Sequence, residues 1–189
     1  MRVIAGKYRS RPLRSLRGLE LRPTADRLRE TLFDILCAGN PERLTDSVFL
    51  DLYAGTGAVG IEALSRGARV AYFVEPARRA AALVRANLKS LEIESEAFEI
   101  MEQECSLALR RMDTQGVVCD YCFLDPPYRG LDEYDESLGF LSQSRLLRTT
   151  SLVIAEHTKR ADLAERFGAL VRYRKVEQGD ATLSFYRLS

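Results

Sequence analysis

The chain has 189 residues, of which 46% are hydrophobic and 29% are charged, so we expect one folded domain with a sizeable core. It has no apolar run near the ~18 residues that a membrane span needs, and its N-terminus lacks the apolar stretch of a secretory signal, so a cytoplasmic protein is expected. The net charge is +1, but residues 1–29 carry +7 and the remainder carries −6, which favours a polyanionic partner over an arm that only aids solubility.

The predicted elements begin with two short extended segments and a helix. The extended segments cover residues 2–8 and 12–16 and would form a hairpin if they pair. The helix covers residues 22–39, with Thr24 as its N-cap and Gly39 as its stop signal.

Apolar strands and helices then alternate along the chain. The predicted strands cover residues 47–53, 69–76, 97–101, 118–125 and 151–157, and the predicted helices cover residues 57–68, 77–91, 105–112, 131–144 and 161–168. Residues 170–189 alternate like two strands around a turn at Gly179 and Asp180, which indicates a hairpin.

This alternation is typical of a parallel sheet with helices on both faces. We therefore predict a Rossmann-like, doubly wound α/β fold with a mostly parallel seven-stranded sheet, a C-terminal antiparallel hairpin and a short basic N-terminal β-hairpin extension. The extension is assigned to residues 1–20 and the main domain to residues 21–189. Such a sheet binds its ligand at the carboxyl ends of its strands. Acidic residues stand at those ends here, namely Asp51, Glu75, Glu104, Asp125 and Glu156.

The pair Cys119 and Cys122 has the Cys-x-x-Cys spacing of some zinc and redox sites. The sequence has no second cysteine pair or histidine cluster to complete a tetrahedral site, and residues three apart on a strand point to opposite faces. We therefore predict two core cysteines and no metal. His157, the only histidine, is interpreted as a packing or surface residue.

A glycine-rich loop follows the first strand of the main domain. Gly55, Gly57 and Gly60 have the spacing of a dinucleotide-binding loop, and Glu75 follows Gly55 by twenty residues. A diphosphate, however, is disfavoured by a carboxylate, and Asp51 is expected at the lip of the loop. S-adenosylmethionine, which carries a sulfonium and an ammonium, suits this site better. Gly60 is expected to allow close packing of a helix on a strand.

The motif that predicts the reaction is Asp125-Pro126-Pro127-Tyr128, directly after the fourth strand. Two prolines fix the backbone and remove two N–H donors, which leaves a rigid row of carbonyl oxygens beside a carboxylate. These oxygens can accept hydrogen bonds from an exocyclic amine, and Tyr128 offers a ring on which a base can stack. The motif favours methyl transfer to the amino group of a nucleobase over a plain proline turn.

The sequence resembles the RsmD family of bacterial 16S rRNA (guanine-N2)-methyltransferases. Four segments together carry this resemblance, namely residues 2–13, 22–36, 51–68 and 120–128. The resemblance implies S-adenosylmethionine as the cofactor and a guanine of small-subunit ribosomal RNA as the substrate, in an assembled or partly assembled subunit. It implies a catalytic set of Asp125, Pro126, Pro127 and Tyr128, and a cofactor-binding set of Asp51, Tyr53, Gly55, Thr56, Gly57, Glu75 and Glu104. Glu104 departs from the Asp or Asn that is common in the family.

With this resemblance, the basic N-terminal region is expected to contact RNA phosphates, which position the RNA without reading its sequence. The expected contacts are Arg2, Lys7, Arg9, Arg11, Arg22, Arg27 and Arg29. For Arg27 and Arg29 the alternative is a salt-bridged helix, with Asp26 and Glu30 as partners. The protein is expected to be a monomer.

Three other functions stay open at this point. The glycine spacing alone would fit an NAD-dependent oxidoreductase. A DNA adenine-N6 or other amino-methyltransferase would share the proline motif, although those enzymes usually begin it with Asn. A non-catalytic RNA-binding module is disfavoured by the intact Asp125 and glycine loop.

Overall fold

A computed structural model describes the chain except for residues 16–22 and 128–130. Its helices are α1 Pro23–Leu36, α2 Ala58–Ser65, α3 Arg78–Ser90, α4 Cys105–Thr114 and α5 Leu131–Leu141, with a single 3-10 turn at Ser95–Ala97. Its strands are β1 Val48–Leu52, β2 Val70–Val74, β3 Phe98–Met101, β4 Cys119–Leu124, β5 Leu147–Thr158, β6 Arg166–Phe167, β7 Leu170–Gln178 and β8 Ala181–Leu188.

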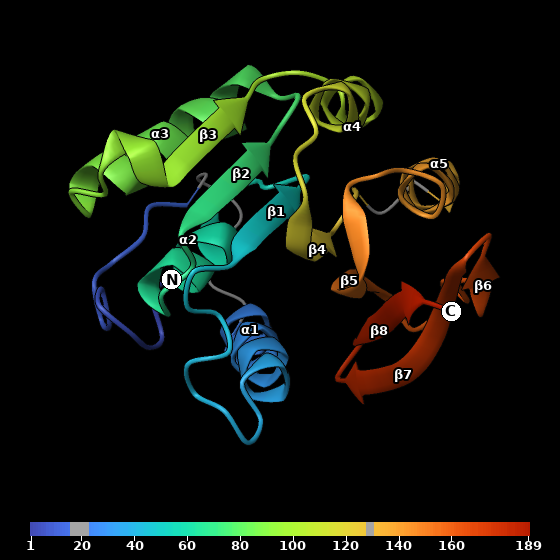
Figure 1. Ribbon diagram of the computed structural model, residues 1–189. Helices are drawn as coiled ribbons and strands as arrows, with labels where there is room; N and C mark the ends of the chain where they lie inside the picture. The colour runs from blue at the N-terminus through green and yellow to red at the C-terminus, as the bar shows by residue number, and fades with distance from the viewer. Residues whose placement is uncertain (16–22, 128–130) are drawn as a thin grey trace.

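The strands form one sheet in the order β3-β2-β1-β4-β5-β8-β7-β6, which Figure 1 shows from one side to the other. The first five strands in this order pair in parallel, and β8, β7 and β6 continue the sheet antiparallel. The predicted doubly wound α/β fold with a C-terminal hairpin is therefore confirmed. The sheet has eight strands rather than seven because β6 adds a two-residue strand at its edge.

Helices cover both faces of the sheet, with α1, α2 and α3 on one side and α4 and α5 on the other (Figure 1). Each face has its own core. Phe33 and Phe73 belong to the core under the first three helices, and Leu109 and Leu138 belong to the core under the other two. The near-continuous burial of β1 and β4 follows from this double cover. No helix among the described residues is long and apolar enough to span a membrane.

The predicted helix over residues 161–168 is wrong, since this segment is irregular before it enters β6. Its carbonyl groups accept hydrogen bonds from the C-terminal hairpin instead of from backbone N–H groups of the same segment. The Tyr186 hydroxyl donates to the Ala164 carbonyl at 2.9 Å, and the Arg172 guanidinium donates to the Leu163 carbonyl at 2.9 Å. These tertiary bonds, together with the burial of Leu163, outweigh the local helical pattern.

Two local predictions also need correction. Helix α1 begins at Pro23, ahead of the predicted N-cap Thr24, in keeping with the preference of proline for the first helical turn. Cys119 and Cys122 do not face opposite sides of the sheet, because an irregularity in the pairing of β4 with β5 between Cys119 and Tyr121 brings both into the same core. Their contact, followed by burial, raises the pKa of the Cys122 thiol.

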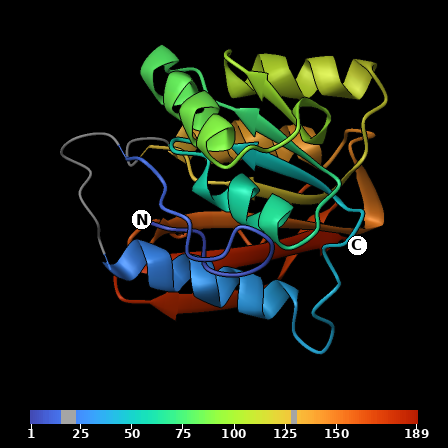
Figure 2. The same ribbon diagram turned by 90° about the vertical axis from the view of Figure 1, so that its left-hand side faces the viewer.

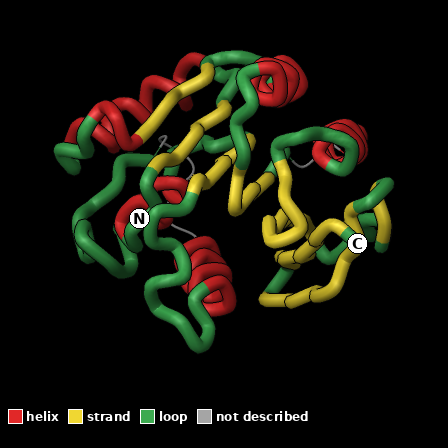
Figure 3. Tube along the Cα trace, in the orientation of Figure 1, coloured by secondary structure: helices red, strands yellow, loops and turns green. Residues whose placement is uncertain are grey.

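The first 15 residues lie across α2 as an irregular hairpin, drawn as loop in Figure 3. Val3 donates to the Arg11 carbonyl at 3.0 Å, and Ser10 donates to the Val3 carbonyl at 2.9 Å, so the predicted pairing is confirmed. Figure 2 shows this segment between α1 and α2. We call residues 1–15 the N-terminal arm. Val3 and Leu13 are buried, which makes the arm part of the core and not a free tail.

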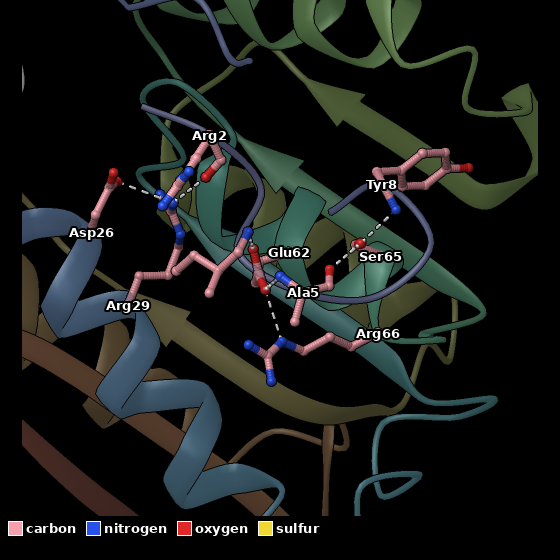
Figure 4. A network of polar contacts seen from close by, with 9 residues as sticks. Arg2, Ala5, Tyr8, Asp26, Arg29, Glu62, Ser65 and Arg66 are labelled. Atoms are coloured by element: carbon pink, nitrogen blue, oxygen red, sulfur yellow. Dashed lines mark hydrogen bonds and ion pairs between the residues drawn. The ribbon is translucent and has the colours of Figure 1, made fainter. Parts of the chain in front are cut away.

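A buried carboxylate anchors the arm (Figure 4). Glu62, fully buried on α2, accepts hydrogen bonds from the backbone N–H groups of Ile4 at 2.7 Å and Ala5 at 3.0 Å. Its charge is balanced by Arg66 at 2.8 Å. The turn of the arm then meets the end of the helix, where Lys7 donates to the Ser65 carbonyl at 2.7 Å.

Candidate active site

The carboxyl ends of the parallel strands meet at one edge of the sheet. In register, Leu52 of β1 lies beside Val74 of β2 and Leu124 of β4, and Leu124 lies beside Ala155 of β5. The residues that follow these positions therefore emerge at the same edge. They include three residues of the predicted site, Tyr53, Glu75 and Asp125, together with Glu156.

Glu75 links the glycine loop to the end of β2. Its Oε2 accepts a hydrogen bond from the Gly55 N–H at 2.8 Å, and its Oε1 accepts one from the Ala77 N–H at 2.8 Å. A carboxylate has about four lone-pair sites, so each oxygen keeps the capacity to accept a further hydrogen bond. This buried side chain is therefore fixed in place and still able to bind the hydroxyl groups of a ligand.

Asp51 lies deeper than predicted. It is the fourth residue of β1, paired with Phe73 and Phe123, and its side chain is only 1% exposed. It therefore does not stand at the lip of the loop. Its Oδ2 accepts a hydrogen bond from the Gly60 N–H at 2.9 Å, in the first turn of α2. Asp51 acts on the site through this contact and through its charge.

Burial raises the pKa of the carboxyl groups at this edge, and neighbouring carboxylates add to the effect for two of them. Burial, and then the nearby charges of Asp125 and Glu75, raise the pKa of Asp51 to about 8. Burial followed by Asp125 raises that of Glu156 to about 8. Asp125 itself is exposed at the rim, but the protein around it limits hydration of its carboxylate and raises its pKa to about 7. Such crowding of acidic groups favours a ligand that brings positive charge.

The glycine loop has the backbone shape that its sequence predicts. Gly55 has a φ of +57° and Gly57 a φ of +76°, which side chains rarely adopt. Among the described residues, a Cβ atom at Gly55 would meet the Tyr53 carbonyl oxygen alone, at 3.9 Å, so these residues leave open space around it. A Cβ atom at Gly57 would contact Val84 at 3.1 Å. Gly55 therefore leaves room for a ligand, whereas Gly57 allows packing against α3.

Tyr53 also has a positive φ, of 60°, which is unusual for a bulky residue. The half-buried side chain reaches α5, where its hydroxyl lies 3.4 Å from Ser137 Oγ. Burial raises the pKa of this phenol well above its ordinary value. A strained backbone held by surrounding contacts is common at binding sites. The strain at Tyr53 is consistent with its predicted place beside a cofactor.

Sequence reasoning missed Asn87 of α3, which is fully buried behind the glycine loop. Its Nδ2 donates to the Thr56 carbonyl at 2.9 Å and to the Arg14 carbonyl at 3.2 Å, and its Oδ1 accepts from the Arg14 N–H at 2.8 Å. The sequence feature that could have revealed Asn87 is its amide in the apolar stripe of α3, seven residues after Ala80 and three after Val84. A polar residue at such a position needs buried partners.

The Asp125-Pro126-Pro127 segment follows β4 at the same edge. Pro126 is buried, whereas Asp125 and Pro127 are exposed. The predicted fourth member, Tyr128, lies outside the described residues. Glu104 is exposed where the chain enters α4, and its backbone carbonyl accepts a hydrogen bond from Ala108. None of the described side-chain hydrogen bonds connects Glu104 to the other predicted site residues.

The predicted RNA-contacting residues have different surroundings. Arg2, Lys7, Arg9, Arg11 and Arg27 are exposed, and Arg22 lies outside the described residues. Lys7 and Arg9 are at the turn of the arm, beside the end of α2 that is far from the glycine loop. Because α2 has eight residues, that separation is roughly 12 Å along the helix axis.

Arg29 does not belong with this exposed set. Its side chain is buried, bonds to the Arg2 carbonyl at 2.6 Å and pairs with Asp26 at 3.1 Å (Figure 4). A guanidinium held inside the protein cannot reach a phosphate, so the predicted RNA contact at Arg29 is wrong and the salt-bridged alternative is correct. His157 is likewise buried, with its ring nitrogens 2.9 Å from the Thr158 carbonyl and from Ser184 Oγ, as expected for a packing residue.

Comparisons with known proteins agree with this fold. The family described as "Conserved hypothetical protein 95" matches residues 1–187. The chain is 35% identical to the Haemophilus influenzae protein named "Ribosomal RNA small subunit methyltransferase D", over 84% of this chain and 79% of that one. It is 34% identical to the Escherichia coli K12 protein of the same name, over 82% of this chain and 74% of that one.

Among solved structures, a hypothetical protein of Thermus thermophilus superposes with a TM-score of 0.81 at 27% identity, over 98% of each chain. The match therefore covers the N-terminal arm, the sheet and the C-terminal hairpin together. Because the family match spans nearly the whole sequence and the curated relatives are about a third identical to it over most of their length, this chain belongs to the family described as "Conserved hypothetical protein 95", which is the RsmD family.

Proposed function

We propose that this protein transfers a methyl group from S-adenosylmethionine to the exocyclic N2 amine of one guanine in 16S ribosomal RNA. The observation that carries the proposal is the convergence of Asp51, Glu75 and Asp125 at one edge of the sheet, with the rigid Pro126-Pro127 segment beside them. Relatives that share a third of the sequence are named small-subunit rRNA methyltransferases.

The residues at the edge fit S-adenosylmethionine, which would supply a methyl group on a positively charged sulfur. The crowded carboxyl groups of Asp51, Asp125 and Glu156 have raised pKa values, and a cationic ligand would relieve their repulsion. Glu75 keeps acceptor capacity for ribose hydroxyls. Open space at Gly55 allows the backbone to approach the ligand. Tyr53, Thr56 and Gly57 complete the proposed site, whereas Glu104 has the weakest support.

The guanine amine would be held by Asp125 and the two prolines that follow it. The lone pair of an aromatic amine is delocalised into the ring, which makes it a poor nucleophile. Accepting hydrogen bonds from both N–H groups returns electron density to the nitrogen and orients it for attack. The Asp125 carboxylate would accept the proton that the methylated amine loses, and proximity and electrostatics would provide most of the catalysis. Tyr128 is proposed to stack on the base.

The arm would position the RNA through Arg2, Lys7, Arg9 and Arg11, with Arg27 on α1 nearby. We propose that residues 1–20 act as the RNA-contacting extension of a methyltransferase domain formed by residues 21–189. The proposed substrate is 16S rRNA in the small subunit or its assembly intermediate in the cytoplasm, and the enzyme is proposed to act as a monomer. The guanine must leave its stack to reach Asp125, so a loop or flipped base is expected.

The test measures methyl transfer to small subunits isolated from cells that lack this protein, followed by mass mapping of the modified base. Replacing Asp125 with Ala is expected to lower turnover by at least about a hundredfold while leaving the affinity for S-adenosylmethionine largely intact. Asp135→Ala, an exposed change on α5, is the matched control and should retain full activity. Full activity of Asp125→Ala, or calorimetric binding of NAD without binding of S-adenosylmethionine, would overturn the proposal.

A further inference from the structure

The cations of β7 differ between the two faces of the strand. On one face, Lys175 lies 3.9 Å from Asp162 and 3.7 Å from Glu177, and Arg172 lies 3.7 Å from Glu165. On the opposite face, Arg174 of β7 and Arg187 of β8 form no ion pair with any described carboxylate. The same holds for Arg43, in the loop between α1 and β1. This difference exists although residues 30–189 carry a net charge of −6.

A β-bulge at Tyr173 creates this second face. The pairing of β7 with β8 passes from Arg172–Tyr186 to Arg174–Phe185, which leaves Tyr173 without a partner. In a regular strand, Tyr173 and Arg174 would point to opposite sides of the sheet. Here both lie over Phe185, with the Tyr173 ring centroid at 6.3 Å and the Arg174 guanidinium carbon at 5.9 Å from the Phe185 ring. Bulges commonly redirect side chains in this way.

Arg187 and the neighbouring residue Arg174 lie beside the exposed ring of Tyr173, and Arg43 lies within electrostatic range of it. The guanidinium carbon of Arg187 lies 5.1 Å from the ring centroid, and 42% of Tyr173 is exposed. Tyr121 donates to the Arg43 carbonyl oxygen at 3.3 Å, and because Tyr121 shares a core cluster with Phe185, this bond places the backbone of Arg43 on the same face of the sheet. Burial raises the pKa of the Tyr173 phenol, while Arg174, Arg187 and Arg43 act in the opposite direction and no described carboxylate joins them.

Protection of the sheet edge explains only part of this arrangement. The short strand β6 pairs with Leu170 and Val171, and the Arg172 N–H donates to the Glu165 carbonyl at 2.8 Å, so the open edge of β7 begins after Arg172. Charged residues prevent such edges from aggregating. Lys175 and its carboxylate partners already serve that purpose. Three unpaired cations repel one another, and an anion from outside the chain would remove that repulsion.

We propose that Arg43, Tyr173, Arg174 and Arg187 form a second RNA-contacting surface, in which the arginines bind phosphates and Tyr173 stacks on an unpaired base. The inference rests on the proposed RNA substrate and adds a contact away from the target guanine. Arginine suits phosphate recognition, and an exposed aromatic ring suits single-stranded bases. In Figure 1, α1 lies between the arm and the β7–β8 hairpin, so the two RNA contacts flank this helix.

The test compares two neighbouring residues of β7, each with one positive charge, whose side chains lie on opposite faces of the sheet. The dissociation constant of 16S rRNA is measured over a range of salt concentrations for Arg174→Gln and for the matched control Lys175→Gln. Arg174→Gln is expected to weaken binding several-fold and to lower the slope of log affinity against log salt by about 0.7, as loss of one single-strand phosphate contact does. Lys175→Gln is expected to leave both quantities close to those of the unchanged protein.

Tyr173 is tested in the same assay. Tyr173→Ala is expected to weaken binding about tenfold, and Tyr173→Phe to restore it, because stacking needs the ring and not the hydroxyl. Thermal unfolding checks that each variant is folded.

Unchanged affinity for Arg174→Gln and Tyr173→Ala, with normal methylation by the unchanged protein, would overturn this surface alone. If these variants lose affinity for whole subunits but not for naked rRNA, the surface contacts a ribosomal protein and not RNA, and the proposal is also overturned. Failure of the unchanged protein to bind or methylate 16S rRNA both as naked RNA and in small subunits would overturn the proposed function itself.

Discussion

Asn87 donates a hydrogen bond to the Thr56 carbonyl at 2.9 Å, so α3 holds the glycine loop from behind. The same amide both donates to and accepts from the backbone of Arg14. One buried side chain therefore ties the loop of the candidate active site to the N-terminal arm. Through it, the position of the arm and the shape of the loop depend on each other.

Replacing Asn87 with Ala should weaken both the fold and the cofactor site. The change removes three partly buried hydrogen bonds to the backbone of Thr56 and Arg14, each worth about 0.5–1.5 kcal/mol, so the free energy of unfolding is expected to fall by about 2–4 kcal/mol. The dissociation constant of S-adenosylmethionine should rise about tenfold, as calorimetry can measure. Lys89→Ala, an exposed change two residues further along α3, is the control. An unchanged dissociation constant in a destabilised Asn87→Ala protein would show that Asn87 supports the fold alone.

Replacing Gly6 with Ala should release the arm from α2. A Cβ atom at Gly6 would lie 1.8 Å from the Ser65 carbonyl oxygen, and the φ of +80° is itself unfavourable for Ala. Amide hydrogen exchange over residues 1–15 is therefore expected to become faster, while the sheet strands stay protected. Gly116→Ala is a matched control, because Gly116 has a φ of +71° but no atom within 4 Å of the added carbon. If both variants behave alike, backbone strain and not the close contact determines the effect.

The sheet could be predicted because its strands are buried on both faces and read as continuous apolar runs. The alternation of strands with helices then predicted the parallel part of the sheet. The role of Gly60 in close packing of a helix on a strand was also predicted correctly. Corrections concentrate where tertiary contacts override local pattern. Residues 161–168 form no helix, because their carbonyl groups accept hydrogen bonds from the C-terminal hairpin. An irregularity in the β4–β5 pairing and a bulge in β7 change the side of the sheet on which nearby side chains lie.

The sequence predicted which residue types form the candidate site, but not how deeply each side chain is buried. A sequence indicates that Asp51 follows apolar residues, but its burial depends on strands that come later in the chain. Arg29 illustrates the same limit, since its charge suggested a surface contact while its partner is the backbone of Arg2. Asn87 was missed because a single amide in a helix gains meaning only when its partners, 31 and 73 residues away, are known.

Replacing Gly60 with Ala should destabilise the protein at the interface of α2 and β2. The added Cβ would lie 2.4 Å from Phe73 Cε1, and Phe73 is fully buried and cannot move aside freely. A loss of about 1–3 kcal/mol in the free energy of unfolding is expected from denaturant titration. Gly139→Ala provides the opposite control in α5, because nothing lies within 4 Å of its added carbon and Ala favours the helix by up to about 1 kcal/mol. Equal effects of the two changes would contradict the packing role of Gly60.

The buried acidic groups predict how stability depends on pH. The pKa of Asp51 is raised from 3.8 to about 8, and that of Asp125 from 3.8 to about 7. Because the folded protein binds these protons more tightly than the unfolded chain, their stabilising effect is complete below about pH 4 and is lost as pH rises through 7 and 8. In the absence of cofactor, the melting temperature is therefore expected to fall over this range. The affinity for S-adenosylmethionine should rise over the same range, since ionised carboxyl groups attract its positive charge.

The variant Asp51→Asn isolates the contribution of this residue. An amide oxygen can still accept the Gly60 hydrogen bond but does not titrate, so the fall in melting temperature between pH 6 and about 9 should be smaller than in the unchanged protein. Comparing variant and parent at each pH cancels the titration of other groups, including His157. Asp34→Asn, on the exposed side of α1, serves as the control and should follow the parent curve. If Asp51→Asn follows that curve as well, Asp51 does not titrate in this range, and the attraction of the site for a cation must come from Asp125 and Glu156.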